Sequence, residues 1–587
     1  MKNSTACFLK IIIIPALFLL SFTSAKAQGF LDVKGKYIVN DKGEKVILRG
    51  MGLGGWMLQE GYMLRFPNEG QQYKIKAAIE DLIGKDKTRE FYDAWLHNHT
   101  TKADIDSMKA WGFNSVRLPM HFNLYTLPIE EEPVKGQNTW LNKGFAITDS
   151  LLEWCKVNEM YLILDLHAAP GGQGNDFNIS DRDPSKPSLW DSEENRNKMI
   201  ALWRKLAARY ADEPWIGAYD IINEPNWGFT DPNDKNGLKE QHNIPLKKLL
   251  VDVINAIREV DKKHIVVIAG NGWGNNYNGM LPPWDDKMVV SFHKYWNYNN
   301  QGSIQHFIDI RDKYNVPIWL GETGENSNSW FTQAISLVEK NEIGWNWWPL
   351  KKMGFNNPLE VKVTEGYQQL LNYWAGKGSK PSADDAYKIM MQMAENTLLK
   401  NCIIKYDVLD AMFRQVNSNV VRPFKKHSTG NIIQAVDYDM GRSNTAYFDT
   451  DSAEYYISTG TARTGWNLGR TYRNDGVDIL KDSTSNESFY VGKIEDGEWL
   501  NYTVNAEEKG NYSIKITVAS DKAGGKISFT TNNLLPARTV LVPDTKGQKT
   551  WQNIILKDVM LIKGINKIRV YADKGGFNLK SFQFSKK

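Results

Sequence analysis

Two glutamates follow strand-like apolar runs in this chain. Glu224 comes directly after Ile221-Ile222-Asn223, and Glu322 comes directly after Trp319-Leu320-Gly321. The two lie 98 positions apart (322 − 224), too far for one supersecondary unit but suited to two strands of a large α/β barrel. Two carboxyl groups that meet at strand ends can cleave a glycosidic bond, one as proton donor and one as nucleophile. The pattern therefore predicts a site that cuts a sugar chain.

Side chains near other predicted strand ends could complete this site. Arg117 could keep one carboxylate ionised, and Asn223 could bond the hydroxyl next to the reacting carbon. Trp348 could form a floor under the bound sugar, because an aromatic ring offers a flat apolar face. Three further residues could hydrogen-bond the carboxylates or the substrate hydroxyls: His167, His293 and Tyr295.

A third glutamate competes for the role of nucleophile. Glu325 lies three residues beyond Glu322, but it follows Gly324 in a loop rather than an apolar run. A buried carboxyl group without partners is costly, so glutamates at apolar strand ends need a reason to be there. We therefore rank Glu325 second. No metal and no cofactor are expected in this site, because the chain has no His-x-x-x-His or Cys-x-x-Cys pattern.

The elements that must position these residues form a repeating pattern. Eight apolar runs alternate with amphipathic stretches over roughly 300 residues, which fits a (β/α)₈ barrel with its active site at the strand C-terminal ends. The runs are Val46–Met51, Phe113–Leu118, Tyr161–Leu166, Ile216–Ile222, His264–Ala269, Met288–Phe292, Pro317–Leu320 and Ile343–Trp348. Helical patterns between them include Leu151–Asn158, Asn197–Tyr210 and Leu246–Val260.

The C-terminal part of the chain changes character twice. From Ser382 to Gln415 a capping-box pattern and a Met-rich apolar stripe predict helices that join two domains. From Thr429 onward short alternating strands and glycine turns predict an all-β jelly-roll sandwich. The predicted divisions are a signal peptide (1–27), the barrel (28–380), a helical connector (381–428) and the sandwich (429–587).

The N-terminus has the pattern of a secretory signal. Lys2 and Lys10 flank a polar start, Ile11–Leu20 is apolar, and Ala25-Lys26-Ala27 is a cleavage pattern. We therefore expect an exported protein in the periplasm, at the cell surface or outside the cell, with no membrane span after signal removal. Removing three lysines lowers the formal charge from +4 to about +1, which argues against nucleic-acid binding. A monomer is expected, and Cys155 and Cys402 allow one disulfide at most.

The strand-end motifs, taken in order, resemble glycoside hydrolase family 5. They are Asn114-Ser115-Val116-Arg117-Leu118-Pro119, Asp165-Leu166-His167, Asn223-Glu224-Pro225, His293-Lys294-Tyr295, Gly321-Glu322 and Trp347-Trp348. The resemblance covers about residues 30–375 and implies a retaining glycosidase that acts on a polysaccharide or oligosaccharide. It implies that Glu224 is the acid/base and Glu322 the nucleophile.

Two further stretches are similar to the branch of that family that contains exo-β-1,3-glucanases. They are Gly52-Leu53-Gly54-Gly55-Trp56 and Leu166-His167-Ala168-Ala169-Pro170-Gly171-Gly172-Gln173. The resemblance makes Trp56 a substrate-binding candidate and lets Glu60 stand for a glutamate common in that branch. A β-1,4-glucan, mannan or xyloglucan substrate stays open, as does a glycan-binding protein without turnover. The loops Gly171–Trp190 and Trp227–Asn243 are expected to decide between endo and exo cleavage.

The C-terminal segment resembles carbohydrate-binding module family 6. The matching stretches are Tyr472-Arg473-Asn474-Asp475-Gly476-Val477-Asp478-Ile479, Gly497-Glu498-Trp499-Leu500-Asn501-Tyr502-Thr503-Val504 and Gly576-Phe577-Asn578-Leu579. Asn578 and Trp551 are its candidate sugar contacts. Lys493 and Gln548 replace two rings common in that family, so binding should be weak or absent. Val436 replaces a common calcium ligand, which puts the family's structural calcium in doubt.

Overall fold

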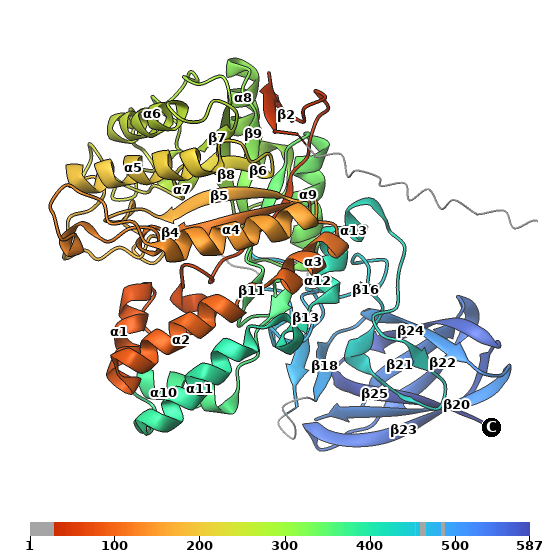
Figure 1. The fold of residues 1–587 in the computed structure, drawn as a ribbon. Coiled ribbons are helices and arrows are strands. Elements are labelled where there is room, and N and C mark those ends of the chain that lie inside the picture. Colours follow the sequence, from red (N-terminus) through yellow and green to blue (C-terminus); the bar gives the residue numbers. More distant parts are fainter. Residues whose placement is uncertain (1–28, 452–453, 458–464, 483–487) are drawn as a thin grey trace, which may run out of the picture.

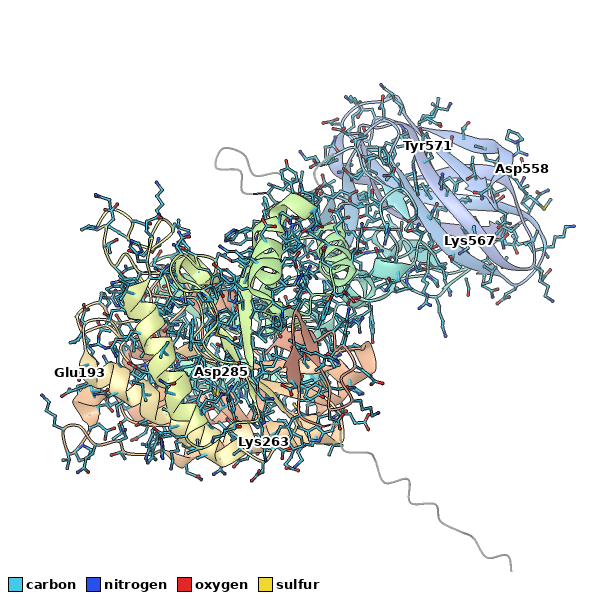
Figure 2. The ribbon with its side chains drawn as sticks, turned by 90° about the horizontal axis from the view of Figure 1, so that it is seen from above. Glu193, Lys263, Asp285, Asp558, Lys567 and Tyr571 are labelled. Carbon is cyan, nitrogen blue, oxygen red and sulfur yellow. The ribbon has the colours of Figure 1, made fainter. Side chains whose placement is uncertain are left out.

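The computed structural model describes residues 29–451, 454–457, 465–482 and 488–587. The predicted signal segment, residues 1–27, lies outside the described residues. Within the described part, no helix has the length and apolar character needed to cross a membrane. The barrel and the sandwich lie side by side in Figures 1 and 2; Figure 2 marks the barrel by Glu193, Lys263 and Asp285 and the sandwich by Asp558, Lys567 and Tyr571.

Eight parallel strands close into a barrel, in the order β10-β3-β4-β5-β6-β7-β8-β9. Each of the eight predicted runs overlaps one of these strands, because strands buried on both faces leave a continuous apolar signature. The strands are β3 (Arg49–Gly52), β4 (Ser115–His121), β5 (Tyr161–Ala168), β6 (Ile216–Asp220), β7 (Ile265–Ile268), β8 (Met288–Lys294), β9 (Ile318–Gly324) and β10 (Trp345–Trp348). The predicted barrel fold is confirmed.

Helices cover the outside of the barrel (Figure 1). The apolar face of α6 repeats at the three- and four-residue spacing of a helix, with Leu246, Leu250, Val253 and Ile257 buried against the strands. The covering helices are α3 (Lys102–Trp111), α4 (Asn142–Val157), α5 (Glu193–Tyr210), α6 (Ile244–Arg258), α8 (Gln305–Tyr314) and α9 (Asn328–Lys340), with a short α7 (Asn271–Gly274) after β7. The three predicted helical patterns correspond to α4, α5 and α6.

The predicted connector helices belong to a small core of their own. Met390 and Met393 of α11 (Ala383–Asn396) are buried together with α1 (Gln72–Ile83), α2 (Lys85–Asn98) and α10 (Glu365–Trp374). These four helices form the group below the barrel in Figure 1. The side chain of Ser382 accepts a hydrogen bond from the Asp385 backbone N–H (3.1 Å), as its capping pattern predicts. Two short helices, α12 (Tyr406–Met412) and α13 (Arg414–Asn417), then pack on α9.

The C-terminal region is a sandwich of two six-stranded sheets. Tyr512, Ile514, Ile516 and Val518 alternate into its core, as the sequence pattern predicts. One sheet contains β14 (His427–Ser428), β16 (Tyr447–Phe448), β19 (Trp499–Ala506), β21 (Gly525–Thr531), β22 (Leu534–Val542) and β24 (Gly564–Lys574). The other contains β15 (Ile432–Gln434), β17 (Ile479–Lys481), β18 (Phe489–Ile494), β20 (Gly510–Ser520), β23 (Gly547–Leu561) and β25 (Phe577–Lys586).

The two cysteines of the described chain are free thiols. Cys155 lies on the buried face of α4, in the barrel core, whereas Cys402 is half-buried between that core and the four-helix group. The disulfide that the sequence allowed is therefore not formed between these two residues.

Candidate active site

Glu322 lies within β9 and is buried, with 5% of the residue exposed. Arg117 Nη1 donates a hydrogen bond to its Oε2 (2.9 Å), and the Tyr295 hydroxyl donates to its Oε1 (2.9 Å). Both carboxylate oxygens are therefore held, one by a permanent cation and one by a neutral hydroxyl. Donors of this kind favour the ionised carboxylate.

Glu224 stands beyond its strand rather than at its end. Strand β6 ends at Asp220, and Glu224 adopts a left-handed backbone conformation with φ 41°. Such a conformation is costly for a residue with a side chain, and the surrounding structure must hold it. Asn226 Nδ2 donates to the Glu224 carbonyl oxygen (2.9 Å), and His293 Nδ1 lies 2.6 Å from Glu224 Oε1. Together these contacts fix both the backbone and the carboxyl group.

The barrel brings the two glutamates face to face. One carboxylate oxygen of Glu224, one of Glu322 and a ring nitrogen of His293 lie within 4.8 Å of one another. A separation of about 5 Å is that of glycosidases that cleave with retention. Among the described residues these three also form the group whose ligand atoms could hold a metal ion, but their atoms already bond one another or Arg117 and Tyr295.

Arg117 is the hub beneath the glutamates. Its fully buried guanidinium donates to Asp220 (2.9 Å), to Glu322 and to Asn223 Oδ1 (2.9 Å), and it pairs with Asp165 (3.2 Å). Burial alone would lower the pKa of Arg117, but the carboxylates of Asp165, Asp220 and Glu322 raise it. Burial raises the pKa of Asp165 to about 7 and that of Asp220 to about 6, against the opposing effect of Arg117.

Asp220 was not among the residues predicted from sequence, and Asp165 was seen only as part of a motif. The available signal was the same one that identified Glu224: each is an acid within or at the end of an apolar strand run. A buried acid of this kind needs a cation, and Arg117 is the cation that the barrel places beside both.

His167 and Asn223 form a second chain of contacts. His167 Nδ1 lies 2.7 Å from Asp165 Oδ2, and Asn223 Nδ2 lies 3.2 Å from His167 Nε2. Burial lowers the pKa of His167 to about 3, so the ring is neutral and donates its Nδ1–H in a hydrogen bond to Asp165. Asn223 is thereby oriented with one amide N–H on the ring and its carbonyl on Arg117, which leaves the second N–H free to donate.

Trp348 lies at the end of β10 with its indole ring stacked on His167 (centroids 5.0 Å, interplanar angle 4°). Its Nε1 donates to the Tyr62 hydroxyl (3.0 Å). The ring fits because two residues of the Gly-Leu-Gly turn have no side chain. A Cβ would lie 2.7 Å from the ring at Gly52 and 2.6 Å at Gly54, closer than packing permits. These glycines therefore give the predicted floor its position.

The surroundings of the two glutamates act differently on the pKa of each carboxyl group. Burial raises the pKa of Glu224 to about 8, and the nearby Asp176 carboxylate adds to the rise. Burial also raises the pKa of Glu322, but His293 and Arg117 oppose that rise. Asp176 is a further residue that sequence reasoning missed; it lies in the loop after β5, where Trp273 Nε1 donates to it (3.4 Å).

The structure gives Trp56 a different place from the one predicted. Its ring lies in the barrel core, and its Nε1 donates to the Leu96 carbonyl oxygen of α2 (2.8 Å). Glu60, four residues on, is buried, and burial and the carboxylates of Glu322, Glu325 and Glu224 raise its pKa well above its usual value. Glu325 is held elsewhere, in an ion pair with Lys352 (2.6 Å).

The two loops expected to shape the site pack on each other beside Glu224. Trp190 contacts Phe229 edge to face (5.0 Å between centroids), and the Arg182 guanidinium lies 4.8 Å from the Trp227 ring. Asn175 Nδ2 also donates to the Lys235 carbonyl oxygen (2.6 Å). The loops therefore form one contiguous wall, so a change in either will alter the other.

The loop end of the sandwich has a hollow of about 680 Å³ that contains Asn578. Asn578 Nδ2 donates to the Gln548 carbonyl oxygen (2.6 Å), and Lys493 and Gln548 line the hollow where rings are common in similar modules. Trp551 lies at its side, with Nε1 on Asp482 (3.1 Å) and its ring edge to face with Tyr490 (5.1 Å). Its ring is thus engaged in packing.

Val436 lies in the sandwich core, where its side chain contacts other apolar residues. An aliphatic side chain has no oxygen to offer a calcium ion, which is bound by oxygen ligands. The position therefore does not fit the calcium site that similar modules contain.

Comparison with known families matches both domains. Residues 76–354 match the family described as cellulase (glycosyl hydrolase family 5), and residues 470–586 match carbohydrate binding module family 6. A protein named beta-xylosidase from Phanerodontia chrysosporium is 26% identical over 393 residues, covering 61% of this chain and 78% of that protein.

Two further relatives carry other names. Endoglucanase C from Acetivibrio thermocellus is 24% identical over 368 residues, covering 52% of this chain and 92% of that protein. A protein named probable glucan 1,3-beta-glucosidase A from Aspergillus clavatus is 27% identical over 290 residues, covering 49% of this chain and 64% of that protein.

Proposed function

We propose, from the premise that the barrel of this chain belongs to glycoside hydrolase family 5, that Glu224 and Glu322 cleave a β-glycosidic bond by double displacement. The protein is a glycosidase that hydrolyses O-glycosyl bonds in β-glycans, and its second domain belongs to carbohydrate binding module family 6. The roles of the two glutamates are the part that we infer.

In the first displacement, Glu322 attacks the anomeric carbon while Glu224 protonates the leaving oxygen. Arg117 and the Tyr295 hydroxyl keep the attacking carboxylate ionised and oriented. Glu224 has a pKa of about 8, so it holds the proton that the leaving group needs at neutral pH. A covalent glycosyl ester on Glu322 results, and the leaving sugar departs as an alcohol.

In the second displacement, ionised Glu224 takes a proton from water, which attacks the same carbon and releases Glu322. Attachment of the sugar neutralises Glu322 and removes its negative charge, so Glu224 can then hold a charge of its own more easily. The free N–H of Asn223 is in place to bond the hydroxyl next to the reacting carbon, since its other groups bond His167 and Arg117.

The observation that carries this proposal is the approach of the two carboxylates to within 4.8 Å, with different partners on each. Bringing two acids together in the barrel interior costs free energy unless a cation lies between them, and a purely structural role would give no reason for that cost. Arg117 contacts Glu322 alone of the two.

The substrate that we propose is a β-glucan with β-1,3 or β-1,4 linkages. The names of the relatives also include a xylosidase, so a β-xyloside is a second candidate. Mannan, xyloglucan and a non-catalytic glycan-binding role remain alternatives. We further propose that the enzyme is exported by its N-terminal segment, acts as a monomer and needs no cofactor.

The test is hydrolysis of aryl β-glucosides, aryl β-xylosides and purified β-glucans by the full chain and by Glu322→Ala. We expect activity in the parent enzyme and none in the variant, and product sizing will separate endo from exo cleavage. Unchanged activity in Glu322→Ala would refute the assignment. Glycan binding without turnover in the parent chain would favour the non-catalytic alternative.

A further inference from the structure

The turn that follows the proposed nucleophile touches the sandwich. Strand β9 ends at Gly324 and α9 begins at Asn328, so the β9–α9 turn (residues 325–327) starts three residues after Glu322. Asn326, Ser327 and Asn328 are all buried, although the turn lies at the surface-facing end of a barrel strand. Side chains and backbone of the sandwich are among the groups that contact them.

Asn326 bonds the sandwich through its side-chain amide and its backbone carbonyl oxygen. Its Nδ2 donates to the Tyr456 carbonyl oxygen (2.9 Å), and its Oδ1 accepts from the Tyr456 backbone N–H (3.1 Å). Its own carbonyl oxygen accepts from Asn474 Nδ2 (2.9 Å). The turn and the sandwich thus share reciprocal hydrogen bonds of the kind that join strands.

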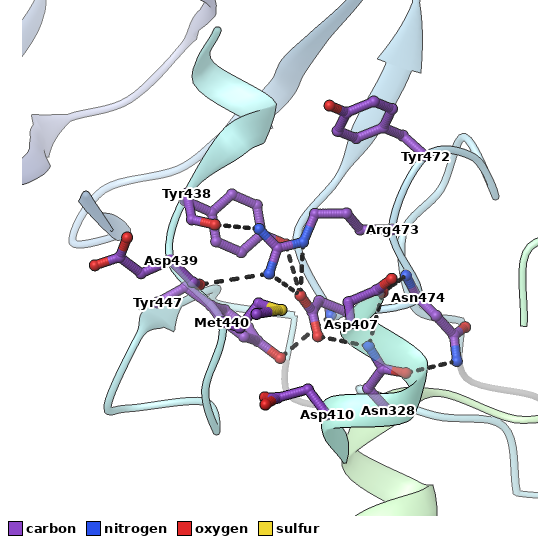
Figure 3. Close-up of polar contacts among 12 residues, drawn as sticks. Asn328, Asp407, Asp410, Tyr438, Asp439, Met440, Tyr447, Tyr472, Arg473 and Asn474 are labelled. Carbon is purple, nitrogen blue, oxygen red and sulfur yellow. Dashed lines mark hydrogen bonds and ion pairs between the residues drawn. The ribbon is translucent and has the colours of Figure 1, made fainter. Parts of the chain in front are cut away.

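Asn328, the first residue of α9, continues the junction. Its backbone N–H donates to the Asn474 carbonyl oxygen (2.9 Å), and its Oδ1 accepts from Asn474 Nδ2 (3.0 Å). Its Nδ2 donates to Asp475 Oδ1 (2.9 Å) and to Asp407 Oδ2 of α12 (2.9 Å). Figure 3 shows Asn328 between Asp407 and Asn474, with residues of all three regions meeting at one point.

Buried charge makes this junction specific. Arg473, which is fully buried, donates to Asp475 Oδ2 through Nε (3.0 Å) and Nη2 (2.6 Å), and its guanidinium lies 3.6 Å from the Tyr438 ring centroid. Asp407 accepts from the Asn474 backbone N–H (2.7 Å) as well as from Asn328. Opening the junction would take the Asn328 donor from Asp475 Oδ1 and the Asn474 N–H donor from Asp407, and a buried acceptor that loses its donor is strongly unfavourable inside a protein.

The same turn reaches the floor of the site. Gly324 has φ 143°, and a Cβ there would lie 2.4 Å from the Trp348 carbonyl oxygen. Glu325 pairs with Lys352, and its carbonyl oxygen accepts from Trp296 Nε1 (3.3 Å). A shift of the turn would therefore move the strand that carries Glu322 relative to Trp348.

We infer that the sandwich is a fixed brace for the catalytic site, in which Asn474 and Asp475 act as positioning residues that hold the β9–α9 turn and thereby Glu322. This inference rests on the proposed role of Glu322. It assigns the sandwich a part in cleavage of every substrate, including small soluble ones that a tethered binding module would not affect. The sandwich thus acts through the barrel and needs no sugar contact of its own.

The experiment compares the full-length parent with Asn474→Ala on a soluble aryl β-glycoside. Because a small misplacement of a catalytic group can cost about 10²-fold, we expect kcat to fall by about tenfold or more while KM changes by about twofold or less. The rate of covalent inactivation by a 2-deoxy-2-fluoro aryl glycoside, which reports attack by Glu322 directly, should fall by the same factor. Asn474→Asp keeps the size of the side chain and should show a similar loss, because it lacks the Nδ2 donor.

The matched control is Asn566→Ala. Asn566 is an equally buried asparagine in the sandwich, but it bonds Ile562 and Gly564 within that domain. This variant loses a comparable set of bonds, and we expect its soluble-substrate kcat to stay within about twofold of the parent. A folded Asn474→Ala with parental kcat and inactivation rate would overturn the brace, as would an equal loss in Asn566→Ala.

Failure of the proposed function would look different. In that case the parent enzyme itself would resist the fluorinated inactivator, whatever the state of the junction. Should Asn474→Ala not fold, Asp475→Asn provides the second test with the same expected direction, because it keeps the size and an acceptor oxygen but removes the negative charge that pairs with Arg473. Parental kcat in that variant would equally contradict the brace.

Discussion

The barrel mouth and the loop end of the sandwich are the two regions where the sequence predicts sugar contacts, yet they are built differently. In the barrel each candidate side chain is held by another: Glu322 by Arg117, and Asn223 by His167. In the sandwich hollow, Lys493 and Gln548 are exposed and carry no flat ring. The comparison teaches how the two regions differ in chemistry: the barrel mouth presents side chains fixed by partners, whereas the hollow presents a lysine and a glutamine with no ring to stack on a sugar.

The largest expected effect concerns the proton donor. Glu224→Gln keeps the shape of the side chain but cannot donate or take a proton, so kcat on β-glucan should fall by about 10³-fold or more. An aryl glycoside with a good leaving group needs less protonation, and its first step should suffer much less. Burst kinetics with both substrates measure this. An equal loss on both would contradict the role of acid.

The second effect is on stability and tests the hub of the barrel. Arg117→Ala would leave Asp165, Asp220 and Glu322 buried without their cation. Breaking a buried ion pair in this way costs about 3–5 kcal/mol of the free energy of unfolding. Denaturant unfolding measures the loss, and Lys493→Ala in the sandwich hollow is the exposed comparison. A loss of less than about 1 kcal/mol in the free energy of unfolding of Arg117→Ala would show that Arg117 does not hold these carboxylates together.

The third effect is the pH dependence of the barrel site. The Glu224 carboxyl must be protonated in the first step, and its pKa is about 8, above the usual value of 4.5. Activity should therefore be present below pH 8 and should fall about tenfold per pH unit above it. The profile of kcat/KM against pH checks this. An alkaline limb that survives in Glu224→Gln with the same midpoint would assign the titration to another group.

A smaller effect would be a gain in the sandwich. Placing rings in its hollow by Lys493→Tyr with Gln548→Trp should restore glycan binding, at roughly 1–3 kcal/mol per ring by analogy with stacking on nucleic-acid bases. Titration of soluble β-glucan into inactive Glu322→Ala chains, with and without the two rings, measures the gain. Strong glycan binding by the sandwich before the rings are added would contradict the difference that we describe between the two regions.

The smallest expected effect is that of chelation. Since Val436 offers no ligand for calcium, EDTA should leave kcat and Tm unchanged. A Tm that falls with EDTA and returns with Ca²⁺ would show an ion held elsewhere in the sandwich.

The barrel and most of its site could be predicted because burial on both strand faces produces apolar runs, and acids at their ends stand out. Asp176 could not be, since it lies in a loop whose position depends on Trp273. Trp56 was misplaced because an aromatic residue after a glycine turn can face the mouth or α2, and only packing decides. The junction could not be predicted because Asn328, at the start of α9, and Asn474, in a loop, are 146 positions apart and carry no pattern that links them.

The central claim is that Glu322 is the nucleophile of a retaining glycosidase. Its most direct test is to trap the enzyme with a 2-deoxy-2-fluoro β-glycoside and to map the labelled peptide by mass spectrometry. The account predicts one sugar per chain, attached to Glu322 through an ester. A label on Glu325 or on any other residue would contradict it, as would an unlabelled active enzyme whose first product has the inverted configuration.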